Sequence, residues 1–384
     1  MAYVKMIPYI ASPGPGPGGL TGTYTVNLNL NDSNPLTWAT YADDAVGMEA
    51  GSDDWDSFFG HYPCIVANGV EGDKLDPNDY TKTVGGSPAP ITTLGNDVMV
   101  CYPRRGLKIE QSGNILSVSM TTDEGKSGYS YMAHSYKGVA KDRFYLAAYK
   151  GHVDGNKLYS VSGQVPTTNL TIGNFRSYAQ ARGTGYEQSA FYQLTFRQAM
   201  YVLKYKGQNA QVAVGRGFVD SNIREIYGNT GYTNDKGMDW GESTGKFPMK
   251  LFGLEDFYGN IYEFIDGIYS GSNRQLLAAD GNYNDTGSGY VTVSSVTASS
   301  NWSGYMRYPV GTNAGGFAPL VSNTNKGDEN TYFCDEAGVY AERFGAFGGY
   351  SMDAGAAGVF LFYISSQASR INDVFGARLM FFPS

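Results

Sequence analysis

The three histidines are the residues of this chain best suited to acid–base chemistry, yet their surroundings predict no catalytic site. His61, His134 and His152 lie in no GxSxG or HExxH setting. A catalytic nucleophile needs a base and an orienting group beside it, and the sequence offers no such set. Gly215-Arg216-Gly217 contains a GxG, but without a matched strand and helix this is weak evidence for a phosphate loop. We therefore predict no catalytic residues.

Metal chemistry is equally poorly supported. Cys64, Cys101 and Cys334 are far apart and odd in number, which argues against a disulfide framework and a CxxC-type metal site. We expect buried thiols in a protein made in a reducing cytoplasm. Two loops rich in oxygen ligands, Asp76–Tyr80 and Asn282–Gly289, could hold structural Ca²⁺, although Asx turns are the commoner use of such sequences. We predict no other cofactor.

The carboxylates form two clusters in the sequence. Asp256, Glu263 and Asp266 form one, which we interpret as part of the scaffold. Residues 53–56 contain three aspartates and are typical of a solvated turn. An enzyme that trims cell-wall polymer would need an acid/base pair in a cleft, and sequence alone does not pair these groups.

Composition narrows the class of protein. The chain has 384 residues, of which 42% are apolar and 17% are charged, as in packed globular proteins. The net charge is −8 without a basic stripe, so we expect no nucleic-acid partner. No apolar run reaches membrane-spanning length, and the N-terminus lacks the pattern of a signal peptide. We therefore expect no membrane insertion, and release by lysis or a dedicated machine if the protein acts outside the cell.

Tyrosine is unusually frequent, with 31 residues. Tyr gives a large contact area for little lost side-chain entropy, and its hydroxyl tolerates water, so it suits binding surfaces. It also suits β-strands, and for the chain as a whole both interpretations stay open.

The elements that must position these residues are mostly short. "SPGPGPGG", Ser12–Gly19, cannot form a helix or an inner strand and is typical of a linker. Alternation from Tyr24 to Leu30 predicts a strand with one buried face, and Asn96–Pro103 is a nearly continuous apolar strand. Helical spacing predicts a helix over Ser189–Gly207, capped by its end residues, and a shorter one near Arg176–Gly185.

Helical periodicity fades after residue 210, where short strands and long loops rich in Gly and Asn follow. This pattern favours an α+β class, with one or two helices clasped by many short strands and long loops, over an alternating βαβ arrangement. We predict an arm over residues 1–20, a β-rich region over 21–95 and a larger domain over 96–384.

Several stretches resemble a family of phage tail proteins. They include "NDVMVCYPRRGLKI" (Asn96–Ile109) and "GKFPMKLFGLEDFYGNIYEFIDGIY" (Gly245–Tyr269), and the likeness runs from about residue 21 to the C-terminus. "GLEDFYGNIYEF" (Gly253–Phe264) also resembles the G-L-x-D-x-x-G-N-V-x-E-W signature of C-type-lectin-like domains in the formylglycine-generating enzyme group. The resemblance implies a C-type-lectin-like domain over residues 96–384. Within the signature we expect a tight turn at Gly259-Asn260 and a Glu263 that accepts backbone N–H groups from an irregular loop.

The C-terminal segment, residues 347–378, is similar to the variable region of retroelement-diversified lectin-fold proteins of phage tails. Phe347-Gly348-Gly349 opens it and Phe375-Gly376-Ala377-Arg378 closes it. Glycines let the backbone pack where a Cβ would clash, and Arg378 brings five donors that can tie a loop to the core. The residues that we predict to form the scaffold are Gly253, Gly259, Asn260, Glu263, Gly348, Gly349, Gly376 and Arg378.

Between these anchors, side chains are free to vary and to face a receptor. Adenine-directed mutation of Asn codons reaches the residue types of the candidate positions, whereas it cannot produce Met352 or Gln367, which we expect to be fixed. A plain buried strand is the alternative for "AGVFLFYI", above all for Val359, Phe360 and Leu361. The predicted receptor-binding positions are Tyr350, Ser351, Asp353, Ala354, Ala356, Phe362, Tyr363, Ile364, Ser365, Ser366 and Ser369.

The resemblance implies a virion protein, a homotrimer at the phage tail tip, that binds a protein or glycan receptor on a bacterial surface. Residues 21–95 would then serve trimerisation and docking to other tail or baseplate proteins. Formylglycine-generating enzymes use a pair of late cysteines, and the ergothioneine-type branch uses a His-rich iron site. Here the late half holds only Cys334, and no His follows residue 152, so neither activity is expected. The alternatives are a structural tail subunit and a wall-degrading enzyme.

Overall fold

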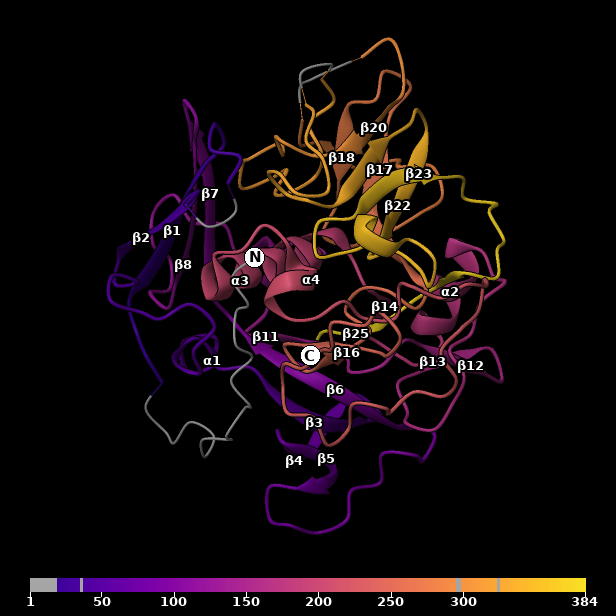
Figure 1. The fold of residues 1–384 in the computed structure, drawn as a ribbon. Helices are drawn as coiled ribbons and strands as arrows, with labels where there is room; N and C mark the ends of the chain where they lie inside the picture. The colour runs from indigo at the N-terminus through magenta and orange to yellow at the C-terminus, as the bar shows by residue number, and fades with distance from the viewer. Residues whose placement is uncertain (1–18, 35–36, 295–297, 323–324) are drawn as a thin grey trace.

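The computed structural model describes residues 19–34, 37–294, 298–322 and 325–384. The predicted arm over residues 1–20 therefore lies outside the described residues, except for Gly19 and Leu20. Within the described ranges, three sheets surround one long helix, as Figure 1 shows.

The first sheet has four antiparallel strands in the order β2-β1-β8-β7. The predicted strand from Tyr24 to Leu30 is confirmed, because its alternate apolar side chains are all buried. Its register sets Val26 opposite Val118, so apolar side chains of neighbouring strands share the inner face. The strands are β1 (Thr23–Asn29), β2 (Ala39–Asp43), β7 (Gly106–Ser112) and β8 (Ile115–Thr121).

The second sheet has seven strands in the order β14-β25-β11-β6-β3-β4-β5. The predicted apolar strand is β6, which is buried over most of its length because its two faces pack in two different hydrophobic clusters. The last strand of the chain, β25, lies between β14 and β11. The strands are β3 (Tyr62–Ala67), β4 (Val70–Asp76), β5 (Asp79–Thr83), β6 (Asn96–Pro103), β11 (Arg143–Ala147), β14 (Tyr186–Gln188) and β25 (Leu379–Phe381).

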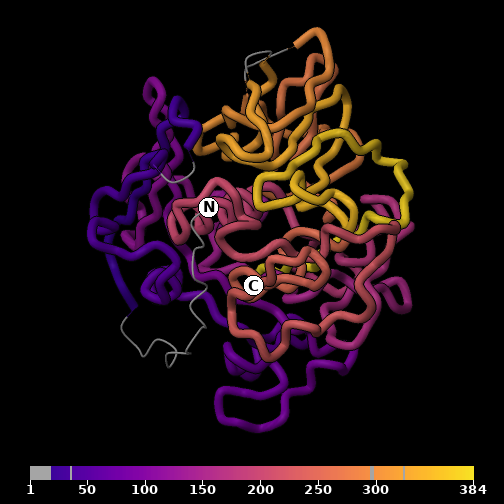
Figure 2. Tube along the Cα trace, in the orientation of Figure 1, coloured from indigo at the N-terminus to yellow at the C-terminus, as the bar shows by residue number. Residues whose placement is uncertain are grey.

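The third sheet has eight strands and carries most of the C-terminal segment. Its main order is β19-β18-β17-β22-β23-β21-β20, and β24 pairs with β17 in parallel. The strands are β17 (Tyr262–Ser270), β18 (Leu276–Ala278), β19 (Val291–Thr292), β20 (Trp302–Tyr305), β21 (Glu336–Val339), β22 (Arg343–Phe347), β23 (Phe362–Ser366) and β24 (Phe375–Gly376). In Figure 2 the yellow end of the chain runs from this upper sheet back to the centre, where the C label lies.

Small hairpins and short 3₁₀ turns fill the connections. Each hairpin has two strands of two or three residues, so none is long enough to show a period in the sequence. They are β9 (Ser135–Tyr136) with β10 (Val139–Ala140), β12 (His152–Asp154) with β13 (Lys157–Tyr159), and β15 (Lys250–Leu251) with β16 (Leu254–Glu255); the 3₁₀ turns are η1 (Met132–His134) and η2 (Ala354–Ala356).

The long helix α3 (Phe191–Tyr205) lies at the centre and contacts β1, β8, β17 and α1 (Asp54–Phe59). Its residues are buried up to Lys204, as expected for a helix covered on all sides. The helix predicted over Ser189–Gly207 is confirmed with shorter bounds, because Ala190 is its N-cap and Lys206 ends it in the left-handed region.

The second predicted helix starts earlier than expected. α2 (Ile172–Gln180) begins after Thr171, whose side chain forms a capping box with Asn174. A fourth helix, α4 (Ala210–Ala213), is a single turn. Among the described residues, no helix combines the length and apolarity needed to cross a bilayer.

The predicted fold class is wrong. Over the described residues the chain is mostly β, with twenty-five strands and four α-helices, so it is not an α+β arrangement with a C-type-lectin-like domain over residues 96–384. The prediction gave too much weight to the helical pattern of α3. Many later strands have only two to four residues, which is too short for alternation to identify.

The predicted boundary between residues 95 and 96 lies within shared sheets. β1 pairs with β8, and β3 pairs with β6, so the first two sheets both join strands from either side of that position. The two predicted regions therefore share their hydrogen-bond ladders and much of one hydrophobic core.

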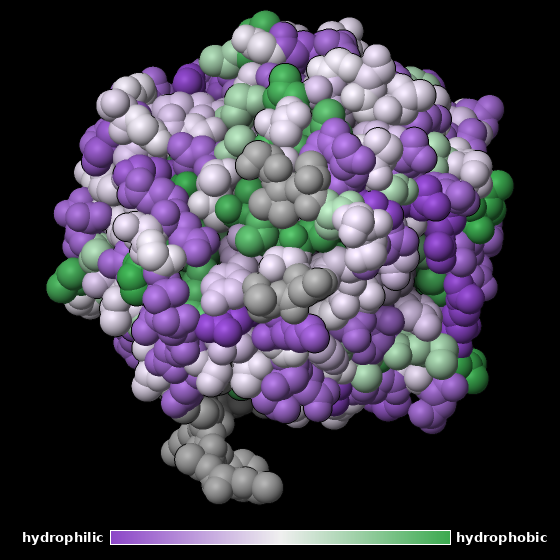
Figure 3. All heavy atoms as spheres, turned by 90° about the horizontal axis from the view of Figure 1, so that it is seen from above, coloured by the Kyte–Doolittle hydropathy of each residue, from purple (hydrophilic) through white to green (hydrophobic). Residues whose placement is uncertain are grey.

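The surface is mixed in character. Figure 3 shows hydrophilic residues over most of the face seen from above, with hydrophobic residues in smaller groups. Cys64, Cys101 and Cys334 are free and buried, so the prediction of buried thiols is confirmed. His61 and His134 are also buried, and burial lowers the pKa of each to about 3, so both are neutral at physiological pH.

Candidate functional site

The C-terminal segment leaves β22 through a double-glycine turn. Gly348 and Gly349 have φ values of 89° and 84°. A Cβ on Gly349 would lie 2.9 Å from the Cβ of Ala357, and one on Gly348 would lie 3.2 Å from the Cα of Tyr258. Both the backbone conformation and the close packing therefore favour glycine here. The Gly259 N–H donates to the Gly348 carbonyl at 3.0 Å, which joins the turn to the predicted signature.

Asn260 ties the start of the segment to two other loops. Its Nδ2 donates to Oδ2 of Asp256 at 2.7 Å, and its Oδ1 accepts from the Tyr227 N–H at 2.9 Å. Its backbone carbonyl accepts from the Ser351 N–H at 3.2 Å. The tight turn predicted at Gly259-Asn260 is present, since both residues have positive φ. Asn260 therefore holds the start of the C-terminal segment through its backbone carbonyl and holds the other two loops through its side chain.

Glu263 lies at the centre of a buried ion cluster. Its carboxylate is 2.9 Å from Nε of Arg378, 3.2 Å from Nζ of Lys150 and 3.4 Å from Nη2 of Arg197, and all four side chains are fully buried. Burial alone would raise the pKa of Glu263, but the three cations outweigh it and hold the pKa well below its ordinary value. The expectation that Glu263 accepts backbone N–H groups was therefore wrong, because cationic side chains take its oxygens.

Arg378 is the last residue of the C-terminal segment, and it links the segment to this ion cluster. Its Nη1 donates to the Ala147 carbonyl at 2.8 Å, and its Nη2 donates to the carbonyls of Glu255 and Asp256 at 2.8 and 3.1 Å. Together with Glu263, these contacts satisfy the guanidinium and join β24 and β25 to the core.

The other two scaffold glycines lie at close approaches. Gly253 is in the turn between β15 and β16, and its carbonyl accepts from Oη of Tyr80 at 3.0 Å. Gly376 lies in β24 beside β17, where a Cβ would meet Cδ1 of Ile261 at 2.6 Å. Apart from Gly253, which packs against Tyr80, the predicted scaffold residues therefore lie at or contact the two ends of the C-terminal segment.

Strand alternation divides the candidate positions in β23. Phe362, Ile364 and Ser366 are buried, whereas Tyr363 and Ser365 are half-buried on the opposite face. The prediction that all five are exposed was therefore wrong for Phe362, Ile364 and Ser366. Successive side chains of a strand point to opposite faces, and these three face the core.

Ser351 is the fourth buried candidate. Its carbonyl accepts from the Ser221 N–H at 2.7 Å, and its Oγ accepts from the Glu225 N–H at 3.3 Å. Ser351 therefore anchors a loop instead of facing solvent. The remaining candidates lie at or near the surface: Tyr350, Asp353 and Ala356 are half-buried, while Ala354 and Ser369 are exposed.

The alternative prediction, that "AGVFLFYI" is buried, is confirmed for the middle of the C-terminal segment. Val359, Phe360 and Leu361 are fully buried in the turn before β23. Met352 and Gln367, which we expected to be fixed, are both exposed. The segment therefore consists of two surface stretches separated by a buried one.

A cleft of about 290 Å³ opens beside these surface stretches. The Tyr262 ring stacks between those of Tyr350 and Phe375, with centroid distances of 5.7 and 4.8 Å. We call this cleft the C-terminal cleft. Its lining residues are Arg224, Tyr262, Ala346, Tyr350, Tyr363, Arg370, Asn372, Val374 and Phe375. Only Tyr350 and Tyr363 were among the predicted positions. The polar run "SRIND", Ser369–Asp373, was the sequence feature that could have added Arg370 and Asn372.

Asp353 beside this cleft is expected to titrate near neutrality. Burial raises its pKa from 3.8 to about 6. Hydrogen bonds from the Tyr262 side chain and from the Tyr350 N–H lower the pKa, but burial outweighs them. The folded protein therefore holds this proton more tightly than the unfolded chain, so Asp353 favours folding at low pH and loses that contribution as pH rises from about 4 to about 6. NMR titration should give a midpoint near pH 6.

The matched variant Asp353→Asn keeps the acceptor for the Tyr350 N–H but cannot ionise. Its free energy of unfolding should fall less than that of the wild type between pH 4 and pH 7. Identical pH profiles for the two proteins would contradict the raised pKa.

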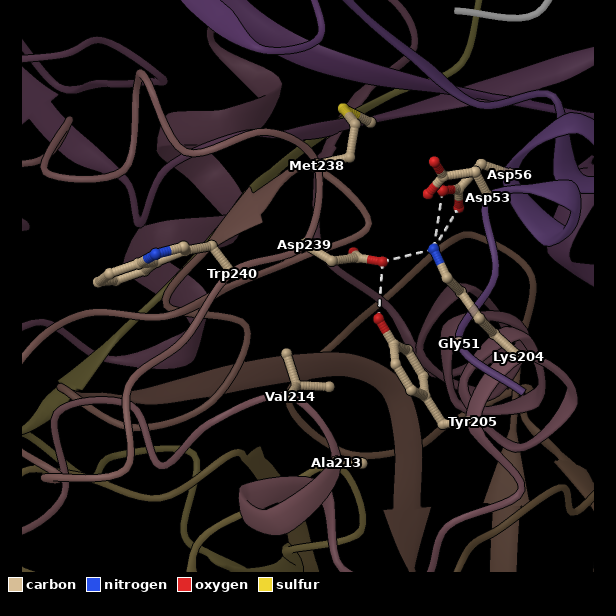
Figure 4. A pocket seen from close by; sticks show the side chains of 10 residues that line it. All are labelled: Gly51, Asp53, Asp56, Lys204, Tyr205, Ala213, Val214, Met238, Asp239 and Trp240. Atoms are coloured by element: carbon tan, nitrogen blue, oxygen red, sulfur yellow. Dashed lines mark hydrogen bonds and ion pairs between the residues drawn. The ribbon is translucent and has the colours of Figure 1, made fainter. Parts of the chain in front are cut away.

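A second cavity, of about 160 Å³, holds a buried ion cluster around Lys204, which Figure 4 shows. Nζ of Lys204 lies 2.7 Å from Oδ2 of Asp56 and 2.6 Å from Oδ2 of Asp239. Oη of Tyr205 donates to the same Asp239 oxygen at 2.8 Å. The cluster joins α1, α3 and the loop before β15. Residues 53–56 were expected to form a solvated turn. This is wrong for Asp56, because it lies in α1 and pairs with the buried Lys204.

The electrostatics of this cluster argue against a nucleophilic lysine. Burial works to lower the pKa of Lys204, but the two carboxylates outweigh it and raise the pKa, so the amine stays protonated. Burial raises the pKa of Asp56 to about 7, whereas Lys204 holds that of Asp239 below its ordinary value. A protonated lysine between carboxylates acts as a structural tie.

The remaining carboxylates that the sequence singled out are also bound within the fold. Asp266 accepts two hydrogen bonds from Arg176, each 2.8 Å long. The two loops considered for Ca²⁺ form Asx turns, in which Asp76 accepts from the Asn78 N–H and Asn284 from the Thr286 N–H. Within the described ranges, no group of three or more His, Cys, Asp or Glu side chains is placed to hold a metal ion.

Comparison with known proteins adds little to this geometry. No protein family matches the chain, and no curated protein matches it either. Among solved structures, the chain is similar to PvdO from Pseudomonas aeruginosa, with 12% sequence identity and a TM-score of 0.31, over 77% of this chain and 100% of that one. At that score the likeness carries no argument about fold or function.

Proposed function

We propose that this chain is a virion tail protein of a phage and binds a receptor on the bacterial surface through the C-terminal cleft and the surface around it. The observation that supports the binding site in this proposal is the cleft itself, which draws most of its lining from residues 346–375. A concave site with aromatic walls and a few polar groups is the usual form of a ligand site.

The anchoring of the C-terminal segment supports this proposal. Its ends are held by the double-glycine turn and by the buried Arg378 cluster, while Tyr350 and Tyr363 remain partly accessible between them. A rigid frame lowers the ordering cost of binding, and tyrosine adapts to polar and apolar partners.

The wider setting rests on the sequence resemblance alone. We propose that the protein is a homotrimer that docks to other tail or baseplate proteins, and that a retroelement diversifies residues 347–378. Several copies on one tail would convert weak individual contacts into stable attachment.

Substitution of both accessible tyrosines tests the proposed site. Labelled full-length protein should bind saturably to cells of the host bacterium within a panel of species. The double variant Tyr350→Ser, Tyr363→Ser should bind at least about tenfold more weakly, because buried aromatic anchors dominate most interfaces. Flow cytometry over a concentration series measures this change.

Tyr129→Ser is the matched control, since Tyr129 is a half-buried tyrosine outside the C-terminal segment. It should bind like the wild type. Unchanged binding by the double variant would refute the site, and binding to no species of the panel would favour a structural tail subunit.

A further inference from the structure

Three side-chain donor groups of the C-terminal cleft make no hydrogen bond or ion pair with a described residue. The Arg370 guanidinium makes no ion pair there, whereas Arg224 on the same cleft pairs with Asp373 at 2.8 Å. The Tyr350 hydroxyl and the Asn372 side-chain Nδ2 likewise make no hydrogen bond with a described residue. A cation, a hydroxyl and an amide therefore line one concave site with their donor capacity unused.

The exposed Arg370 side chain packs over an aromatic ring. The guanidinium carbon of Arg370 lies 4.5 Å from the centroid of the Phe375 ring, and Phe375 stacks on Tyr262. Such contacts restrict an arginine side chain before a ligand arrives, which lowers the entropy cost of binding.

The charge balance favours a ligand with one negative charge. Of the two arginines that line the cleft, only Arg370 lacks a carboxylate partner. Glu336 accepts from the Tyr363 hydroxyl and Asp353 accepts from the Tyr262 hydroxyl close by, and the chain carries a net charge of −8. A multiply charged anion would meet repulsion here, whereas a single carboxylate matches the planar guanidinium in a bidentate contact.

The sheet geometry argues against an extended peptide as the occupant. β23 lies between β22 and β21, so its backbone groups are already paired on both edges. A peptide could not add a strand there, and strand addition is a main way in which sheets bind extended chains. A compact, hydroxyl-rich ligand suits the free hydroxyl and amide better.

We propose that the C-terminal cleft binds a carboxylate-bearing sugar, such as a hexuronic acid residue of a surface polysaccharide. Arg370 holds the carboxylate, and Tyr350 and Asn372 bind the ring hydroxyls. This inference rests on the proposed function and names the chemistry of its receptor.

Ligand-observed NMR with the full-length chain tests the proposal, using D-glucuronate as the probe. Glucuronate should bind at least about tenfold more tightly than D-glucose, because the charged contact is lost with the neutral sugar. Arg370→Gln should weaken glucuronate binding by a similar factor and leave glucose binding unchanged. Arg343→Gln is the matched control, since Arg343 is an arginine on β22 that does not line the cleft, and it should bind glucuronate like the wild type.

Each competing outcome is decisive. Equal binding of glucuronate and glucose, or an unchanged affinity in Arg370→Gln, would overturn the inference. So would inorganic phosphate or N-acetyl-aspartate amide displacing glucuronate at equal concentration, which would indicate a general anion site or an acidic protein receptor. If the tyrosine double variant loses cell binding while glucuronate fails to bind, the receptor-binding function stands and only the sugar is wrong.

Discussion

Replacing Glu263 with glutamine is expected to lower the free energy of unfolding by about 3–5 kcal/mol, the usual cost of removing one partner from a buried ion cluster. The substitution keeps the size of the side chain but removes the only carboxylate within 4 Å of Lys150, Arg197 and Arg378 among the described residues. Three cations would then remain fully buried with no carboxylate within 4 Å among the described residues. Urea denaturation at pH 7 measures the change.

The pH dependence gives a second readout of the same variant. The pKa of Glu263 is held below its ordinary value of 4.5, so its stabilising contribution is present above about pH 4.5 and is lost as pH falls toward the folded pKa. The difference between wild type and Glu263→Gln should therefore shrink in acid.

Glu110→Gln is the control, because Glu110 is an exposed residue paired with Lys108 on the surface. It should change stability by less than about 1 kcal/mol. Equal effects of the two glutamine substitutions would mean that the buried cluster does not stabilise the fold.

Truncating Phe360 is expected to cost about 3–5 kcal/mol, as for other buried phenylalanines replaced by alanine. Phe360 is fully buried, and its ring packs against Phe333, Phe317 and Tyr201 at centroid distances of 4.9, 5.4 and 5.9 Å. Phe360→Ala would leave a cavity at the point where the C-terminal segment enters the core. Thermal and chemical denaturation should both report the loss.

Met352→Ala is the matched control within the same segment. Met352 is 43% exposed, so its truncation should change stability by no more than about 0.5 kcal/mol. A comparison of the stability losses of Phe360→Ala and Met352→Ala distinguishes the buried positions of the segment from its surface positions. A small effect of Phe360→Ala would mean that the buried middle of the segment is not tightly packed.

Local patterns in the sequence predicted the longer elements. Alternation identified β1, and helical spacing identified α3, because each element is long enough to repeat its period several times. The later strands were missed, since β19 and β24 have two residues each and no period can be read from them. That shortfall led to the wrong fold class.

The candidate site was predicted only in part, for a physical reason. The scaffold glycines and Arg378 were identified because they stand in the sequence motifs that carry the family resemblance. The alternation of "FYISS" (Phe362–Ser366) is the sequence signal that separates the buried candidates from the accessible ones. Arg224 comes from a distant loop, and Lys204 pairs with Asp56 across 148 positions of sequence, so only the folded structure brings such groups together.

The place of β25 between β14 and β11 has a consequence for how the protein is made. The seven-stranded sheet contains strands from the first third of the chain, yet it cannot close before the ribosome has passed residue 381. A stop codon or frameshift introduced anywhere in residues 347–378 would leave that sheet open. Truncated copies would expose the unpaired edges of β11 and β14, and unpaired strand edges make a chain prone to aggregation.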